Sequence, residues 1–98
     1  MIIVTGDVHS RPDAIDEVLA ISLEHVHRSR LEPGCLLHSV HRDVEDPDRL
    51  VFVEHWESAE ALRAHFAVPA SVEFVGRLGA LTVGDPDLAV YEATKTRV

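Results

Sequence analysis

The chain has 98 residues, of which 46% are hydrophobic and 27% are charged. This length suffices for one hydrophobic core and is too short for two, so we expect a single folded domain over residues 1–98. Nine Lys and Arg against seventeen Asp and Glu give a formal net charge of -8, which argues against nucleic acid and anionic membrane surfaces as partners.

The first third of the chain predicts a strand followed by a long helix. Residues 2–8 alternate apolar and polar side chains, as half-buried strands do. Ser10 is the expected N-cap of the helix, with Pro12 in its first turn and Asp13 reaching back to it. The expected buried stripe of this helix is formed by Ile15, Val18, Leu19, Leu23 and Val26.

A β-hairpin is predicted next, after Pro33 and Gly34 end the helix. Its strands cover residues 35–44 and 50–57, joined by the turn-forming run 45–48. The short connection makes the strands antiparallel. The expected register sets Val44 opposite Arg49, Val40 opposite Val53, and His38 opposite His55.

The second half of the chain predicts two helical segments and a closing strand. Ser58 is the expected cap of a short helix that carries Leu62, His65 and Phe66 on one side. Pro69 opens a further helical segment, and residues 88–96 alternate as a strand. The order β-α-β-β-α-β predicts an α+β, ferredoxin-like fold, in which a four-stranded antiparallel sheet carries helices on one face.

Both faces of the predicted hairpin carry several large apolar side chains, yet helices can cover only one of them. A second copy of the chain is the simplest cover for the other face, because two-fold dimers are the commonest oligomers. We therefore expect a homodimer; the alternative is a monomer that exposes a modest apolar patch.

The sequence resembles the antibiotic-biosynthesis-monooxygenase (ABM) family. The motifs that carry the resemblance are Glu32-Pro33-Gly34-Cys35, Phe52-Val53-Glu54-His55-Trp56-Glu57-Ser58, and Ala61-Leu62-Arg63-Ala64-His65-Phe66 with Pro69. They occur in the expected order and spacing, and with the β-α-β-β-α-β order they cover nearly the whole chain. The resemblance implies a dimeric α+β barrel.

The resemblance also implies a range of activities. Some members of the family oxidise quinols or polyphenols with molecular oxygen and use neither metal nor flavin, whereas others isomerise small sugar-derived signals. A haem-degrading branch uses a helical Trp and a haem-binding His. Here His65 stands at the Trp position and Val75 falls near the His position, so we expect no haem and no other cofactor.

Seven histidines suggest a metal site, but their spacing does not support one. The pair His25 and His27 points to nearly opposite sides of a helix, and His38 and His41 do the same on a strand. His38 and His55 could meet across the hairpin, but two ligands without a nearby third make a poor site. We therefore expect no functional metal.

His65 is the candidate catalytic residue. It follows Leu62 by one helical turn and precedes Phe66, which places an imidazole at the edge of the buried stripe. An unperturbed histidine titrates near ~6.5, so it can act as a general base at neutral pH. The alternative is a surface histidine held by a hydrogen bond.

A set of neighbouring residues is expected to bind the substrate. Trp56 ends a strand just before the helix of His65 and could stack on a planar ring, or could be a core residue. Glu54 shares its strand face and needs a partner such as Ser39 or His41 if buried, or an intersubunit hydrogen bond. The full candidate set is Trp56, Phe66, His38, Phe52, Phe74 and Glu54.

Two classes of function remain open. The first is a cofactor-independent monooxygenase that oxidises a small electron-rich aromatic, with His65 removing a phenolic proton in a dry pocket. The second is a non-catalytic dimeric module that binds a small metabolite; an isomerase with the same pocket is a third possibility. No second acid or base is evident near His65, which favours binding.

The sequence predicts a cytoplasmic location. It has a single cysteine, so no internal disulfide can form, and no apolar run approaches the ~20 residues needed to cross a membrane.

Overall fold

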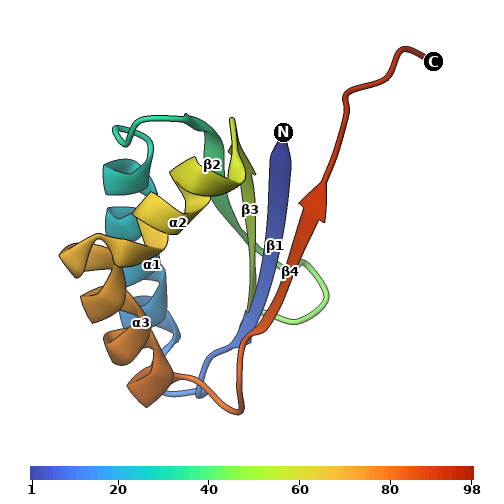
Figure 1. The fold of residues 1–98 in the computed structure, drawn as a ribbon. Helices are drawn as coiled ribbons and strands as arrows, with labels where there is room; N and C mark the ends of the chain where they lie inside the picture. Colours follow the sequence, from blue (N-terminus) through green and yellow to red (C-terminus); the bar gives the residue numbers. More distant parts are fainter.

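The computed structural model describes residues 1–98 as one antiparallel four-stranded sheet with all of its helices on one face (Figure 1). The sheet order is β2-β3-β1-β4, which confirms the ferredoxin-like α+β prediction. The elements are β1 (Ile2–His9), α1 (Ile15–Ser29), β2 (Cys35–Arg42), β3 (Arg49–Trp56), α2 (Ala59–Ala67), α3 (Pro69–Leu81) and β4 (Asp87–Glu92).

Helix α1 begins later than the sequence predicts. Ser10 does not cap it: its backbone N–H donates to the Asp48 carbonyl at 2.7 Å, and the residue forms a bridge with Thr82. These bonds hold Ser10 against the end of the sheet, so the helix starts at Ile15. The predicted stripe is also partly wrong, because Leu23 is 46% exposed. The buried residues of α1 are Val18, Ile21, Ser22, His25, Val26 and Ser29.

The predicted hairpin register is wrong by one residue. Val40 lies opposite Phe52, and His38 lies opposite Glu54 rather than His55. The cause is the turn, in which the Asp43 carboxylate accepts from the Glu45 N–H at 2.7 Å and from the Arg49 guanidinium at 2.8 Å. Asp43 therefore pairs with Arg49 and pushes Val44 into the loop. The shift turns His38 and Val40 to the face that carries Glu54 and Trp56.

The space between sheet and helices contains two apolar clusters with a polar layer between them. The larger cluster includes Leu50, Phe52 and Phe74, and the smaller is built around Val4, Trp56 and Leu62. Burial of each such large side chain contributes about 1.5–3 kcal/mol. The buried polar side chains between them come from four elements: His25 of α1, His38 of β2, Glu54 of β3 and His65 of α2.

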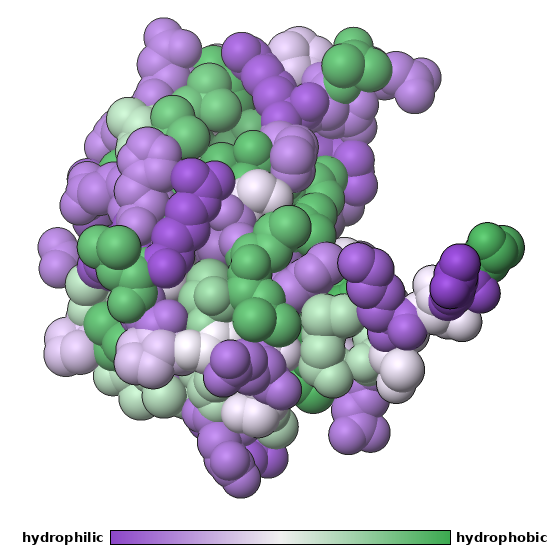
Figure 2. All heavy atoms as spheres, turned by 90° about the horizontal axis from the view of Figure 1, so that it is seen from above, coloured by the Kyte–Doolittle hydropathy of each residue, from purple (hydrophilic) through white to green (hydrophobic).

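The other face of the sheet has no helix over it. Ile3, Thr5, Val51 and Val53 point to this face and are only partly buried. The chain end beyond β4 projects away from the body, and Figure 2 shows the molecule hollowed on the side away from the helices. No helix has the length and apolar character required to cross a membrane.

Candidate active site

His65 is fixed inside the molecule by the start of α2. The Ser58 hydroxyl accepts from the Ala61 N–H at 3.1 Å, as an N-cap does, so His65 falls two turns into the helix. Its side chain is 2% exposed, and Nδ1 lies 2.8 Å from Oε1 of Glu32. Because a carboxylate only accepts, Nδ1 carries the proton of the neutral ring, and Nε2 carries the free lone pair.

Glu32 reaches His65 because the loop after α1 comes very close to α2. Gly34 in this loop has φ +83°, and a Cβ built there would lie 2.6 Å from the Cβ of Ala61. Its carbonyl accepts from the Glu57 N–H at 2.9 Å, which ties the loop to the end of β3. Only glycine allows this approach, so Gly34 holds Glu32 against the imidazole.

Glu54 is a buried carboxylate beside the same imidazole. Its Oε1 accepts from Trp56 Nε1 at 2.9 Å, and it lies 3.4 Å from Nε2 of His38 and 3.9 Å from Nε2 of His65. Burial acts to raise the pKa of Glu54, but His38, Trp56 and His65 outweigh it and hold the pKa below its usual value. The glutamate is therefore ionised.

The expected partners of Glu54, Ser39 and His41, are not at the site. They form a hydrogen bond of 2.9 Å with each other on the opposite face of the sheet. The one-residue error in the predicted register accounts for this, because it placed them on the face of Glu54.

His25 is a further member of the site, and it was not predicted from the sequence. Its Nδ1 lies 2.7 Å from Nη2 of Arg28, and its ring stacks on Phe74 with centroids 4.0 Å apart. Burial, followed by His38, His65 and Arg28, lowers the pKa of His25 to about 3. The ring is therefore neutral at physiological pH, and its Nδ1 accepts the hydrogen bond from Arg28.

The rings of His25, His38 and His65 form a nearly equilateral triangle. Their centroids lie 5.3 Å apart for His25 and His38, 5.2 Å for His25 and His65, and 5.4 Å for His38 and His65. One nitrogen of each ring lies within 4.8 Å of the others. The side chain of His38 is 0% exposed; its Nδ1 has no polar partner, and its Nε2 faces the Glu54 carboxylate without the geometry of a hydrogen bond.

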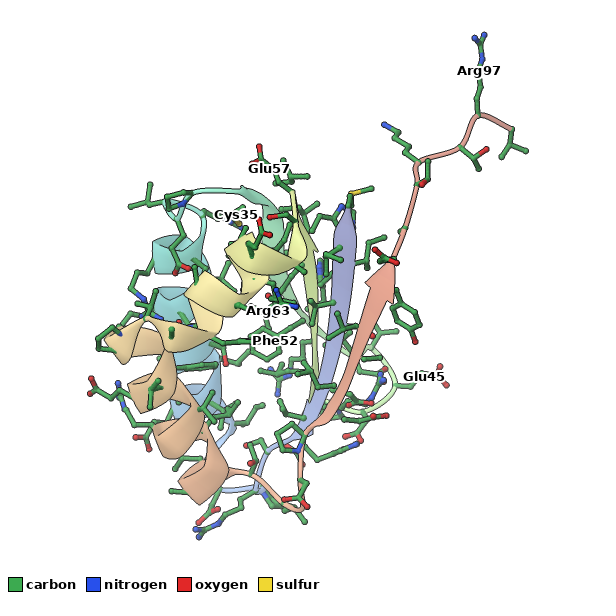
Figure 3. The ribbon with its side chains drawn as sticks, viewed as in Figure 1. Cys35, Glu45, Phe52, Glu57, Arg63 and Arg97 are labelled. Atoms are coloured by element: carbon green, nitrogen blue, oxygen red, sulfur yellow. The ribbon has the colours of Figure 1, made fainter.

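A cavity of about 560 Å³ opens beside His65, between the sheet and α3. Phe52 points from the sheet toward the helices (Figure 3) and forms part of its wall. Most of its surface is apolar, and the polar groups on the wall include His25, Glu54, His65 and Ser71. The remaining lining residues are Gly6, Val8, Phe66, Val72, Phe74, Val75, Leu78, Gly79, Pro86 and Leu88.

The structure gathers most of the predicted site residues but divides them into two groups. Phe52, Glu54, Phe66 and Phe74 line the cavity together with His65. Trp56 and His38 do not line it; they lie behind His65, with the Trp56 ring centroid 4.7 Å from that of His65. Trp56 therefore orients Glu54 and packs against His65 from the core side.

The acidic residues that act on His65 were not predicted from the sequence. No second acid or base was expected near this histidine, but Glu32 and Glu54 both lie within 4 Å of its ring nitrogens. Glu32 stands at the head of the motif Glu32-Pro33-Gly34-Cys35, so its presence there was a usable signal. His25 could have been found from the helical spacing of Ser22, His25 and Ser29 on one face of α1.

Comparison with known proteins connects this chain to a family. Residues 1–77 match the family model described as antibiotic biosynthesis monooxygenase. An uncharacterized protein of Synechocystis is 31% identical over 96 residues, which is 98% of this chain and 65% of that protein. The chain thus spans about two thirds of the length of this curated relative.

Solved structures show the same fold. A crystal structure of an antibiotic biosynthesis monooxygenase is 32% identical, with a TM-score of 0.90 over 97% of this chain and 100% of that one. A Deinococcus radiodurans protein named as a candidate monooxygenase of this kind is 26% identical, with a TM-score of 0.94 over 100% and 97% of the two chains. A Mycobacterium tuberculosis protein at 22% identity shares the fold, with a TM-score of 0.91 over 99% and 98%.

Proposed function

The chain belongs to the antibiotic biosynthesis monooxygenase family, and we propose that it oxidises a small electron-rich aromatic, a quinol or polyphenol, with molecular oxygen and no bound cofactor. One observation carries the proposal. A buried imidazole, whose Nδ1–H is held by Glu32 at 2.8 Å, lies at the wall of a largely apolar cavity with its Nε2 lone pair free.

His65 acts as the general base of this reaction. Its Nε2 removes the phenolic proton, and the carboxylate of Glu54, 3.9 Å away, stabilises the imidazolium that forms. Glu32 keeps the ring in the required tautomer. Phe52, Phe66 and Phe74 exclude water and pack against the aromatic ring of the substrate.

The electrons and atoms balance without an external reductant. The phenolate gives one electron to oxygen, and the phenoxyl radical and superoxide combine to form a bond between a ring carbon and oxygen. The peroxide takes the proton back from His65. His65 then removes the hydrogen of that carbon while the O–O bond breaks, and the leaving hydroxide takes the proton to become water. The product is a quinone that carries one oxygen atom of O₂, and the other oxygen atom leaves as water. The ring supplies all four electrons that reduce O₂.

Homodimer formation is part of this proposal. The face of the sheet without helices carries Ile3, Val51 and Val53 among its partly buried residues, and a second copy would cover it. A soluble, cytoplasmic dimer would present two such cavities.

Oxygen uptake with a panel of quinols and polyphenols, in the presence of EDTA, tests the proposal. His65→Gln should fold normally and lower turnover roughly 10²-fold or more. His27→Gln is the matched control, because His27 is exposed on α1 and should leave turnover unchanged. Equal oxygen uptake by His65→Gln and the native protein would contradict the role of His65. Aromatic binding without oxygen uptake by the native protein would instead favour a binding module.

A further inference from the structure

We propose that His25, His38 and His65 form a binding site for one divalent first-row transition-metal ion, such as Zn²⁺ or Co²⁺, with Glu54 beside it. The inference is independent of the proposed oxidation, and nothing in the family match assigns such a site. It rests on the geometry of the three rings, on the absence of any hydrogen bond at the buried His38 ring, and on the placement of two carboxylates.

The geometry of the rings fits a tetrahedral ion. Three imidazoles that bind one ion at about 2.0–2.1 Å in tetrahedral geometry hold their centroids about 5 Å apart. The three centroid separations here are 5.2, 5.3 and 5.4 Å. The nitrogens lie within 4.8 Å of one another, whereas nitrogens bound to one tetrahedral ion lie about 3.4 Å apart, so the three rings must turn inward to bind it.

His38 supplies an independent reason to expect a ligand here. Its side chain is 0% exposed, Nδ1 has no polar partner, and Nε2 faces only the Glu54 carboxylate, without the geometry of a hydrogen bond. A buried polar atom without a partner loses its hydration and gains no bond in return, so such an atom is rare unless a ligand completes it. Its Nε2 is 3.4 Å from Glu54, so an ion between His38 and His65 would give this nitrogen a partner and lie next to a carboxylate.

The two glutamates suit a divalent cation. Glu32 accepts from Nδ1 of His65, which is the carboxylate–histidine arrangement that orients metal ligands and leaves Nε2 for the ion. Glu54 lies within 4 Å of Nε2 of both His38 and His65. The buried carboxylate of Glu54 and the partly buried carboxylate of Glu32 can therefore balance the double positive charge. Because His25, Glu54 and His65 also line the cavity, a bound ion would keep a position open to it.

The positive charge of Arg28 opposes binding of a cation at this site, which provides a further test. Its Nη2 lies 2.7 Å from Nδ1 of His25 and would compete for this nitrogen if it bound the ion. If Nε2 bound instead, Nδ1 would carry a proton facing the Arg28 N–H. Either way the guanidinium must move, and the Ser71 hydroxyl, 3.5 Å away, offers it another acceptor. Removing the Arg28 charge should therefore tighten binding.

Co²⁺ titration of the protein tests the inference with two spectroscopic readouts. The protein must carry no histidine purification tag, because such a tag would itself bind Co²⁺. We expect one Co²⁺ per chain, a visible absorption band typical of tetrahedral coordination, and quenching of Trp56, the only tryptophan, whose ring centroid is 4.7 Å from His65. His38→Gln should weaken binding at least 100-fold, roughly the upper loss seen for outer-shell changes. Glu32→Gln should weaken it about 10–100-fold.

Two further variants keep the test decisive if His38→Gln fails to fold. Arg28→Met should bind Co²⁺ more tightly than the native protein. The triple variant His9→Gln, His27→Gln and His41→Gln removes exposed histidines and should bind unchanged. The inference is overturned if no band and no quenching appear up to millimolar Co²⁺, if the triple variant abolishes binding, or if Arg28→Met weakens it. Since a bound ion takes the lone pair of His65, Co²⁺ added in EDTA-free buffer should also inhibit any turnover of the protein, but the binding readouts do not depend on that turnover.

Discussion

Nε1 of Trp56 donates a hydrogen bond of 2.9 Å to Oε1 of Glu54, and both side chains are buried under the helices. Residues two apart on a strand share a face, so β3 itself brings the indole to the carboxylate. Trp56 is therefore the donor that keeps a charged group inside the domain, as well as a core residue.

Replacing Trp56 with Phe should destabilise the protein by about 2–4 kcal/mol, because the buried carboxylate loses a donor and the core loses volume. Urea unfolding of the native protein, Trp56→Phe, Glu54→Gln and the double variant measures the coupling between the two residues. We expect a coupling energy of about 1–3 kcal/mol. Because a glutamine oxygen can still accept from Trp56, additive effects of the two changes would show that the negative charge of Glu54 does not strengthen this hydrogen bond.

Cys35 should react slowly with thiol reagents. Burial, with the nearby charges of Glu32 and Glu54, raises the pKa of this thiol above its usual value. The thiolate is the reactive form, so at pH 8 a smaller fraction of Cys35 is reactive than of a free cysteine. Alkylation by iodoacetamide should therefore be several-fold slower than that of a cysteine peptide and should still accelerate as pH rises above 9.

The same alkylation in concentrated urea is the control, because unfolding removes both burial and the neighbouring charges. There Cys35 should react at the rate of the peptide. Equal rates in the folded and unfolded protein at pH 8 would contradict the stated cause.

The fold was predictable because its main signals are local. Alternation in β1, the Ser58 cap and the turn residues after β2 each lie within a few positions of the element that they specify. The hairpin register was harder, since it depends on the Asp43 side chain bonding Glu45 and Arg49, and a single residue of loop length reverses both faces.

The candidate site was only partly predictable because its geometry is not local. His65 was found from helical spacing, but its partners Glu32 and Glu54 come from a loop and a strand that are distant in sequence. The three histidines of the cluster come from α1, β2 and α2. They could not be found by pairing histidines that are close in sequence or opposite each other in the assumed hairpin register. Tertiary contacts of this kind require the strand order and register to be known first.

Gly34→Ala should destabilise the protein by about 2–4 kcal/mol. The substitution places a Cβ at φ +83° and within 2.6 Å of the Ala61 Cβ, so it combines backbone strain with a collision between the loop and α2. Gly84→Ala is the matched control, because φ is +70° there but nothing lies within 4 Å. It should cost only about 1 kcal/mol. Thermal or urea unfolding measures both, and equal losses would show that the close approach at Gly34 is unimportant.

Val53→Arg should convert the proposed homodimer to a monomer. Val53 lies on the face of the sheet without helices, opposite Thr5 on one side and Ser39 on the other, so it is central in that face. A stable dimer buries about 800 Å² on each partner, and an unpaired charge at the centre of such an interface costs several kcal/mol. Sedimentation should give twice the 10.8 kDa chain mass for the native protein and one chain mass for Val53→Arg.

Leu31→Arg is the control for this change, because it adds the same charge away from the sheet. Leu31 lies in the loop after α1 and is 87% exposed. It should remain dimeric. The helices cover the opposite face of the sheet, so Val53→Arg should leave the fold and the cavity beside His65 intact. A native protein that sediments as a single chain at micromolar concentration would contradict the dimer. A Val53→Arg protein that stays dimeric would show that the interface lies on another surface.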